Sequence, residues 1–322
     1  MSSLIEQAAQ RLEQLRRAGA IVSDAKQSQR LPGGGVGAAA PAGEARAAVP
    51  AANSRRVEID LDRLATLGML APNAPRSLLG DQFRVIKRPL IRNAVGKGAS
   101  KIAHGNLIMI TSAVAGEGKS FTAVNLAMSI AAELDHTVML VDADVARPSI
   151  SRILGLTPDT DPILGPGLLD VLDGRAEMTS ALLKTNIDKL TVLPSGTQHS
   201  RATELLASDA MARLLEDMGR RYPDRIIVFD SPPLLLTTEA RVLATHMGQV
   251  VVVVHAEKTL QTDVQSALAT IESCPVRLLL LNQAQTRVEG GYGYGYGYGQ
   301  GGRYGSGGGA AADSSILEAP TT

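Results

Sequence analysis

The sequence predicts an α/β protein whose mainly parallel sheet carries helices on both faces. Three observations lead to this prediction. Short apolar runs alternate with longer amphipathic segments between residues 76 and 288, as in parallel sheets with crossover helices. A glycine-rich loop follows the first apolar run, and acidic residues end two later runs. Because ligands of such sheets bind at the carboxyl ends of the strands, these polar groups are expected at one edge.

Each expected element follows from its pattern of apolar residues. Continuous apolar runs predict strands near 107–112, 137–142, 189–193, 225–230, 249–255 and 277–282. Helical spacing of apolar residues predicts helices near 118–133, 201–219 and 259–272. None of the apolar runs reaches the ~20 residues that span a bilayer, so no transmembrane helix is expected.

Composition divides the chain into four regions. Residues 1–20 are expected to form an amphipathic helix, which either docks on a partner or a membrane or simply packs or frays. Residues 21–75, with a stretch rich in Gly, Ala and Pro, are expected to be a flexible linker. The folded domain is expected over 76–288, and the Gly/Tyr-rich residues 289–322 are expected to be a disordered tail.

Charge and cysteine content exclude several classes of protein. Formal net charge is zero over 322 residues, so no overall field attracts nucleic acid, and no nucleic-acid partner is expected. The single cysteine, Cys274, forms no internal disulfide, which fits a reducing cytoplasm. Glu6 and Arg11 interrupt the N-terminus too early for a signal peptide.

The loop from Ala113 to Ser120 is typical of a phosphate-binding loop, because it joins an apolar strand-like run to a helix-like one. Its glycines let backbone N–H groups surround a polyphosphate, and the helix N-terminus adds partial positive charge. Lys119 is expected to reach the terminal phosphates of ATP, and Ser120 to bind Mg²⁺. The first glycine of the usual pattern is Ala113 here. The expected nucleotide-binding residues are Ala115, Gly116, Glu117, Gly118, Lys119, Ser120 and Phe121.

Carboxylates follow two further strands of the predicted sheet. Asp142 and Asp144 end the second strand, and Asp230 ends the run from Ile226 to Phe229. Asp230 has the position of a Walker B aspartate, which holds Mg²⁺. Asn282 ends the last strand, where it either reads the adenine edge or serves as an ordinary turn residue.

Together these motifs resemble those of the bacterial tyrosine kinases, which use a P-loop NTPase-type fold. The resemblance rests on Gly116 to Ser120, on Asp142-Ala143-Asp144 with its trailing Arg147-Pro148, and on Asp230-Ser231-Pro232-Pro233. It covers residues 76–282 and the tail. The chain is similar to the cytoplasmic half of the two-polypeptide version, and most similar to the exosortase-associated tyrosine autokinases of exopolysaccharide clusters.

The resemblance implies an ATP-dependent protein-tyrosine autokinase. Lys119 would stabilise the transferring phosphate, and Ser120, Asp142 and Asp230 would hold Mg²⁺. Either Asp142 or Asp144 would deprotonate the acceptor, since a phenol needs a base or a metal to become nucleophilic at neutral pH. A membrane-embedded activator of the polysaccharide co-polymerase type is the implied partner, which would recruit the chain to the inner face of the membrane. Three departures from the family pattern are Ala115, Ala146 and Glu239.

The tail concentrates tyrosines between glycines. Glycine imposes little steric demand, so each phenol can enter an active site, and tethering raises its local concentration to about millimolar. Self-association of a Gly/aromatic segment is the alternative interpretation. The expected phosphoacceptors are Tyr292, Tyr294, Tyr296, Tyr298 and Tyr304.

A motif for self-assembly precedes the phosphate loop. Asp81, Arg84 and Lys87 lie at three-residue steps and are expected along one face of a predicted helix. They are similar to the Glu/Arg/Arg motif with which the family forms rings. A homo-oligomer is therefore expected. Added phosphates, each of about −1.5 to −2 charges, are expected to loosen it.

Two other functions remain open on the sequence. An ATPase of the septum-positioning or partition type shares the fold, but it carries an extra lysine early in the loop, where this chain has Val114. A non-catalytic nucleotide-binding regulator of a polysaccharide machine need not keep Lys119, Asp142 and Asp230. A dinucleotide-binding dehydrogenase is excluded, because no Gly-x-Gly-x-x-Gly follows the first strand.

Overall fold

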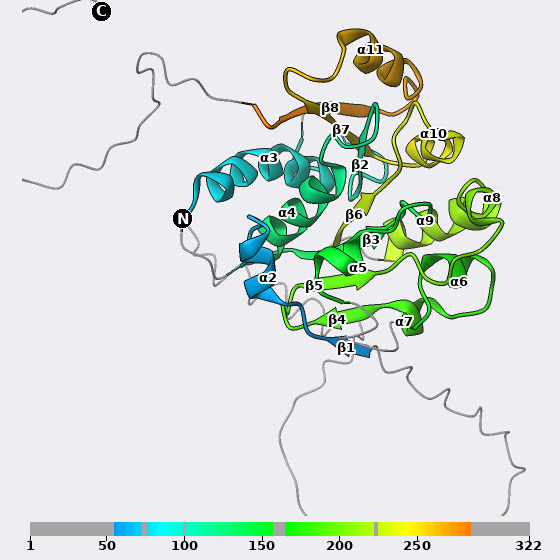
Figure 1. Ribbon diagram of the computed structural model, residues 1–322. Helices are drawn as coiled ribbons and strands as arrows, with labels where there is room; N and C mark the ends of the chain where they lie inside the picture. Colours follow the sequence, from blue (N-terminus) through cyan, green and yellow to red (C-terminus); the bar gives the residue numbers. More distant parts are fainter. Residues whose placement is uncertain (1–54, 73–75, 99–100, 157–164, 222–224, 285–322) are drawn as a thin grey trace, which may run out of the picture. The chain divides into compact units, whose positions relative to one another are not determined.

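The computed structural model contains an eight-stranded sheet with helices on both faces (Figure 1). It describes residues 55–72, 76–98, 101–156, 165–221 and 225–284, all within the compact unit that begins at residue 51. The strand order is β1-β4-β5-β3-β6-β2-β7-β8, and every neighbouring pair is parallel except β4 with β5. The strands are β1 (Arg55–Val57), β2 (Leu107–Ser112), β3 (Thr137–Asp142), β4 (Leu183–Thr185), β5 (Leu190–Leu193), β6 (Arg225–Asp230), β7 (Gln249–His255) and β8 (Val276–Asn282).

One face of the sheet is covered by α2 (Leu61–Thr66), α3 (Leu78–Ala94), α4 (Lys119–Ala131) and α5 (Ile150–Ile153). Strand β2 is buried on both sides, so Ile108 and Ile110 point into this layer while Leu107 and Met109 point into the other. Helix α4 is buried almost all round, because it lies between α3 and the strands β2, β3 and β6. Its small side chains allow this close packing.

The opposite face is covered by α6 (Leu168–Leu172), α7 (Met178–Ala181), α8 (Ala202–Leu206), α9 (Asp209–Arg221), α10 (Thr238–Thr245) and α11 (Gln261–Ala269). Helix α9 shows why they form: Met211, Leu215 and Met218 share one face and are buried, while the rest of the helix is largely charged. Parallel strands under helices on both faces confirm the α/β, P-loop NTPase-type fold class.

The structure departs from the expected elements at several places. The helix expected over 201–219 is two helices, because the Ser208 hydroxyl accepts a hydrogen bond from the Met211 N–H (3.4 Å) and starts α9 separately. Strands β1 and β4, with three residues each, are too short to show a period. The described residues from Arg55 onward are folded, although they lie inside the range 21–75 that the sequence assigns to a linker. Ile59 and Leu64 from that range enter the core, which ties the segment to the sheet.

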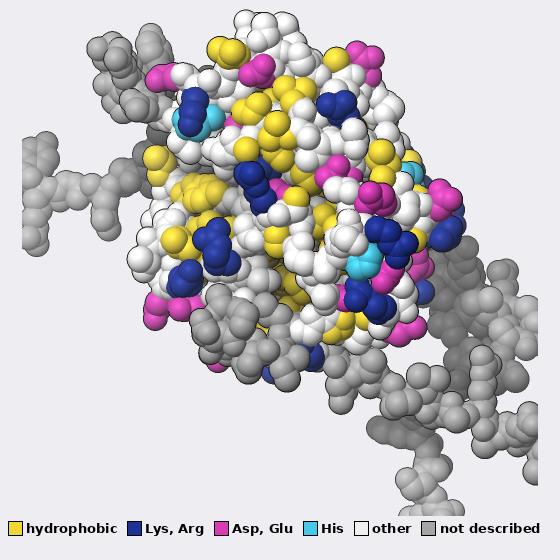
Figure 2. All heavy atoms as spheres, turned by 45° about the vertical axis from the view of Figure 1, so that its right-hand side comes forward, with side chains coloured by type: hydrophobic (Ala, Val, Ile, Leu, Met, Phe, Trp, Pro, Cys, Tyr) yellow, Lys and Arg dark blue, Asp and Glu magenta, His cyan; other side chains and the backbone are white. Residues whose placement is uncertain are grey.

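The surface in Figure 2 carries Lys, Arg, Asp and Glu side chains of both signs interspersed with apolar ones. A face of this kind presents no broad single-sign field. Within the described ranges, no helix is both long and apolar enough to cross a membrane.

Candidate nucleotide and phosphoryl-transfer site

The phosphate loop joins β2 to α4, as the sequence predicts. Gly116 and Gly118 have φ angles of 86° and 93°, a conformation that other residues rarely adopt. There is also a steric reason for glycine at position 118, because a Cβ atom there would lie 2.1 Å from the Asn282 amide nitrogen. A glycine loop of this conformation that leads into a helix N-terminus is suited to binding a polyphosphate.

A buried carboxylate braces this loop from behind. The side chain of Glu117 is 2% exposed and accepts hydrogen bonds from the Val114 N–H (2.8 Å) and from the Thr259 hydroxyl. It also accepts a long one from the His255 N–H at the end of β7 (3.5 Å). The sequence predicts Glu117 as a nucleotide-binding residue of the loop, but it gives no sign of this role for its side chain. The partners that make the side chain important lie more than 130 residues away, which no local pattern reveals.

Asn282 lies over the same loop at the end of β8. Its amide nitrogen donates to the Glu117 carbonyl (2.9 Å), so the side chain is tied to the phosphate loop and not to a turn. That bond leaves the Asn282 amide oxygen as an acceptor.

Asp142 and Asp230 end neighbouring strands and are directly opposite each other in the register of β3 and β6. Both are completely buried. One oxygen of Asp142 accepts the N–H groups of Ser149 and Ile150 (both 3.0 Å), while the other oxygen has no hydrogen-bond partner among the described residues. Neither Asp230 oxygen has such a partner within the described ranges. Buried oxygens of this kind are normally satisfied, so three of them at one place fit a site that binds a cation.

The electrostatics of the pair agree with this interpretation. Burial, followed by repulsion from Asp230, raises the pKa of Asp142 to about 8, although the Ile150 and Ser149 N–H groups oppose the rise. Burial raises the pKa of Asp230 to about 7, although the nearby Ser120 hydroxyl and Lys119 ammonium lower it. A bound cation would stabilise both carboxylates in their charged form.

The residues fit Mg²⁺ better than a metal held by protein alone. No group of three His, Cys, Asp or Glu side chains in the described part of the chain could hold a metal by itself. Mg²⁺ usually takes one or two carboxylates and completes its shell with phosphate oxygens and water. Ser120 begins α4 beside these carboxylates, and its hydroxyl accepts a hydrogen bond from the Ser149 hydroxyl (2.8 Å).

Asp144 lies closer to the surface of the same site. It is 8% exposed, and its carboxylate accepts the Arg147 N–H (3.2 Å). Burial raises its pKa, while the ammonium of Lys119 lowers it and the carboxylate of Glu239 raises it further. Lys119, Asp144 and Asp230 thus meet at one edge of the sheet, as the sequence predicts.

The three residues expected to mediate assembly do not share one exposed face. Asp81 and Arg84 are exposed and pair with each other (2.5 Å). Lys87 is 5% exposed and binds the Ser129 carbonyl (2.5 Å) and Glu133 (2.7 Å) within the chain. The expectation of a common face overlooked helix geometry, since six residues rotate the side chain by about 120° and bring Lys87 to the core side.

The remaining residues that the sequence predicts are Phe121, the five tail tyrosines and the N-terminal helix. Phe121 follows Ser120 in the first turn of α4 and, like Asn282, lines a cavity of about 500 Å³ between α3 and the end of β8. All five tail tyrosines and the helix expected over 1–20 lie outside the described residues.

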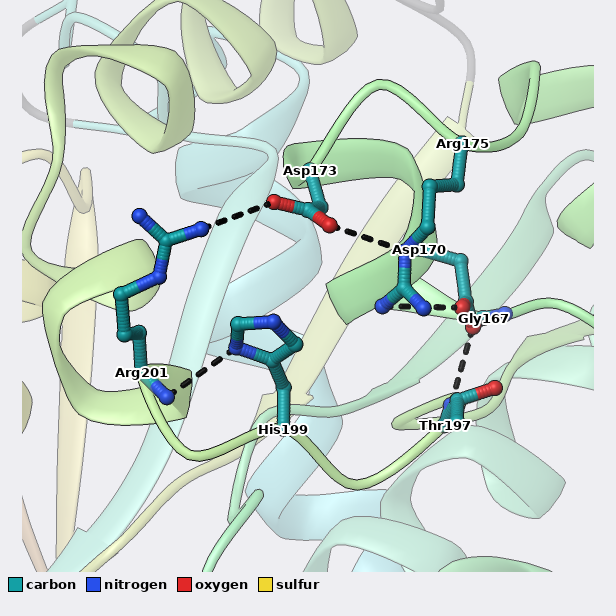
Figure 3. A network of polar contacts seen from close by, with 7 residues as sticks. All are labelled: Gly167, Asp170, Asp173, Arg175, Thr197, His199 and Arg201. Carbon is teal, nitrogen blue, oxygen red and sulfur yellow. Dashed lines mark hydrogen bonds and ion pairs between the residues drawn. The ribbon is translucent and has the colours of Figure 1, made fainter.

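A second polar network, which sequence reasoning missed, lies beside the site (Figure 3). Its hub is Asp170, a buried residue of α6 whose carboxylate accepts the N–H groups of Gly167 and Thr197 (both 2.9 Å). Arg175 adds a contact at 3.4 Å and also pairs with Asp173 at 2.9 Å. The network fixes the segment after β5 against α6.

Comparison with known proteins places these features in a family. The model of the AAA domain family AAA_31 matches residues 105–282. "Tyrosine-protein kinase YwqD" of Bacillus subtilis is 31% identical over 211 residues, which cover 66% of this chain and 83% of that protein. "Succinoglycan biosynthesis transport protein ExoP" of Rhizobium meliloti is 30% identical over 196 residues, which cover 60% of this chain but only 23% of that longer protein.

A solved structure agrees with these sequence relatives. The chimerical protein CapA2B2 superposes with a TM-score of 0.53 at 26% identity, covering 68% of this chain and 97% of that one. Residues 105–282, which the family model matches, contain strands β2 to β8, the phosphate loop and the acidic strand ends described above.

Proposed function

Because this chain belongs to the bacterial tyrosine kinases, a family with an AAA-type nucleotide-binding domain, we propose that it transfers the γ-phosphate of ATP to its own tail tyrosines. One observation carries the proposal: three carboxylates, Asp142, Asp144 and Asp230, lie with Lys119 at the edge where the phosphate loop opens. Such an arrangement positions a triphosphate and receives the charge of a transferring phosphoryl group.

Each residue has a distinct part in the proposed reaction. Asp142, Asp230 and Ser120 would hold Mg²⁺, which would neutralise negative charge on the triphosphate. Lys119 contacts the γ-phosphate. Of the two candidate bases, Asp144 suits the role better, because Asp142 is wholly buried and already accepts two backbone N–H groups. Asp144 takes the phenol proton while the phenol oxygen attacks the γ-phosphorus and ADP leaves.

Asn282 supports selectivity for adenine. Its amide nitrogen is engaged by the Glu117 carbonyl, so its oxygen is left to accept the exocyclic amine of adenine. Guanine carries a carbonyl at that position and would meet an acceptor instead. We expect ATP to be preferred to GTP, and the preference to fall in Asn282→Ala.

The wider role follows from the relatives. We propose that autophosphorylation regulates exopolysaccharide synthesis and export, since one relative is named for succinoglycan biosynthesis transport. In this proposal the chain is cytoplasmic, forms a homo-oligomer through surfaces that include Asp81 and Arg84, and is recruited to the membrane by an embedded activator. Phosphates on the tail then loosen the oligomer.

A partition-type ATPase switch remains the competing function. It would hydrolyse ATP without modifying tyrosine. Val114 stands where that class carries its additional lysine, which favours the kinase.

The decisive experiment is incubation of the full chain with Mg²⁺-ATP, followed by intact-mass analysis. Phosphate additions are expected in the parent chain and in Lys184→Met, a control on the exposed face of β4. They are expected to disappear in Lys119→Met and in a chain whose five tail tyrosines are phenylalanine. ATP hydrolysis without any phosphate addition to the parent chain would instead favour the switch.

A further inference from the structure

The segment after β5 forms one wall of the site. Leu193 ends β5 opposite Val141 of β3, so the residues that follow run alongside Asp142 and Asp144. Gln198 joins the two segments, because its side-chain amide donates to the Val145 carbonyl (2.9 Å). Residues 194–201 therefore border the crevice from the side of Asp144.

This wall is held rigidly from below. Asp170 accepts the Thr197 N–H and the Gly167 N–H with the same oxygen, and Arg175 spans Asp170 and Asp173 (Figure 3). A buried carboxylate with several charge-assisted hydrogen bonds fixes the backbone around it. The backbone that carries the side chains of residues 199–201 is therefore held in place.

Arg201 stands at the top of this wall, 67% exposed. It approaches one oxygen of Asp173 at 3.7 Å, while Arg175 holds the other oxygen at 2.9 Å. An exposed pair at that distance contributes little to stability. The carboxylate of Glu204 also interacts electrostatically with Arg201, and the five donors of the guanidinium exceed what Asp173 uses.

His199 adds a second donor beside it. The backbone N–H of Arg201 donates to Nδ1 of His199 (3.0 Å), so the neutral ring carries its proton on Nε2. Figure 3 shows the ring between the Arg201 and Thr197 ends of the segment. A cationic fork next to a neutral donor is suited to a phosphate monoester.

The expected acceptors are regularly spaced along the tail. Tyr292, Tyr294, Tyr296 and Tyr298 are two residues apart. In an extended chain, residues two apart lie on the same side and about 7 Å from each other. Because Gln198 ties the wall to Val145, directly after Asp144, this spacing would let one phenol enter the crevice while its neighbour contacts the wall.

We propose that Arg201 binds the phosphate of a tyrosine that is already modified while a second tyrosine, two residues away, enters the site at Asp144. The inference rests on the proposed function and concerns its substrate: the enzyme prefers partly phosphorylated tails. Each transfer then favours the next along the repeat, because phosphotyrosine adds about −1.5 to −2 charges that Arg201 recognises.

Synthetic peptides test this preference directly. All proteins are full chains with the five tail tyrosines changed to phenylalanine, so that no internal acceptor competes. The substrates are a Gly-Tyr-Gly-Tyr-Gly peptide and its two singly phosphorylated isomers. At least one isomer is expected to show a KM about five- to tenfold lower than that of the unmodified peptide.

Two variants identify the residue responsible. In Arg201→Ala the ratio of the two KM values is expected to fall to about one, while Arg201→Lys keeps part of the preference. Arg213→Ala, which removes an exposed arginine of α9, is expected to keep the parent ratio. Equal KM values for all peptides in the parent, or a preference that persists in Arg201→Ala, would overturn the proposal.

A binding measurement separates this inference from the proposed function. If no peptide is phosphorylated, the kinase proposal fails, and anisotropy of a fluorescent phosphopeptide with Mg²⁺-ADP present decides on the subsite alone. Binding to the parent that is lost in Arg201→Ala supports the subsite. No binding to the parent refutes it.

Discussion

Replacing Asp230 by asparagine should stabilise the protein in the absence of metal and nucleotide. Burial raises the pKa of Asp230 from its ordinary 3.8 to about 7. Each unit of difference corresponds to about 1.4 kcal/mol, so at pH 8 the ionised carboxylate costs the folded state about 4 kcal/mol. Asparagine removes this cost of about 4 kcal/mol. It also buries an amide without a hydrogen-bond partner, which destabilises the folded state by about 1–3 kcal/mol. The free energy of unfolding should therefore rise by about 1–3 kcal/mol.

The direction of the pH dependence follows from the raised pKa. Below pH 3.8 the carboxyl is protonated in both folded and unfolded states and costs nothing. The destabilisation develops as the pH rises and is complete above about pH 7. The advantage of Asp230→Asn should accordingly be largest at pH 8 and small at pH 4.

Urea unfolding with EDTA at pH 4, 6 and 8 measures these differences. Asp135→Asn, at an exposed carboxyl before β3, is the matched control and should stay within about 0.5 kcal/mol of the parent chain. Addition of Mg²⁺-ATP should stabilise the parent but not Asp230→Asn. If Asp230→Asn folds correctly yet is less stable than the parent at pH 8, the ionised Asp230 carboxylate does not destabilise the folded protein, and the reasoning from its burial is wrong.

Three further predictions concern residues around the site. Glu117→Gln should raise the KM for ATP at least about tenfold, because one donor of the phosphate loop loses a charged acceptor; an unchanged KM in steady-state assays would show that the brace is dispensable. Asp170→Asn should lower the free energy of unfolding by about 1.5–3 kcal/mol at pH 7. Although burial opposes it, hydrogen bonds from Thr197 and Gly167 lower the pKa of Asp170, so its stabilisation is present above pH 3.8 and should fade in urea titrations as the pH falls below that value. Lys87→Met should lower the free energy of unfolding by about 1–3 kcal/mol without changing the sedimentation coefficient of the protein, whereas a changed coefficient would place Lys87 at a subunit contact.

Local sequence patterns predicted those parts of the fold whose physics is local. The continuous apolar runs of β2, β3, β6 and β7 mark strands buried on both faces, and the phosphate loop is recognised by glycines at two positions of positive φ. Acidic residues at strand ends predicted the convergence of Asp142 and Asp230, since parallel strands bring their carboxyl ends to one edge.

Features that depend on distant partners could not be read in the same way. The buried carboxylate of Glu117 depends on Thr259, 142 residues away, and Ile59 is satisfied by Asn186 at a separation of 127 residues. The burial of Lys87 depends on where α3 packs on α4, which the helix pattern alone leaves open. Asp170 looks like any acidic residue in a first helical turn until its partners after β5 are known.

The tie between Asn282 and the phosphate loop has a mechanical consequence. Strand β8 finishes at the rim of the nucleotide crevice, and Tyr292 follows only ten residues later, a stretch that spans at most about 35 Å. In the proposed reaction, the length of this ten-residue segment therefore limits how far Tyr292 can reach from the nucleotide crevice. If tails are phosphorylated between subunits of the proposed oligomer, lengthening or shortening this segment should change which subunit's tyrosine is phosphorylated. The catalytic residues themselves would stay the same.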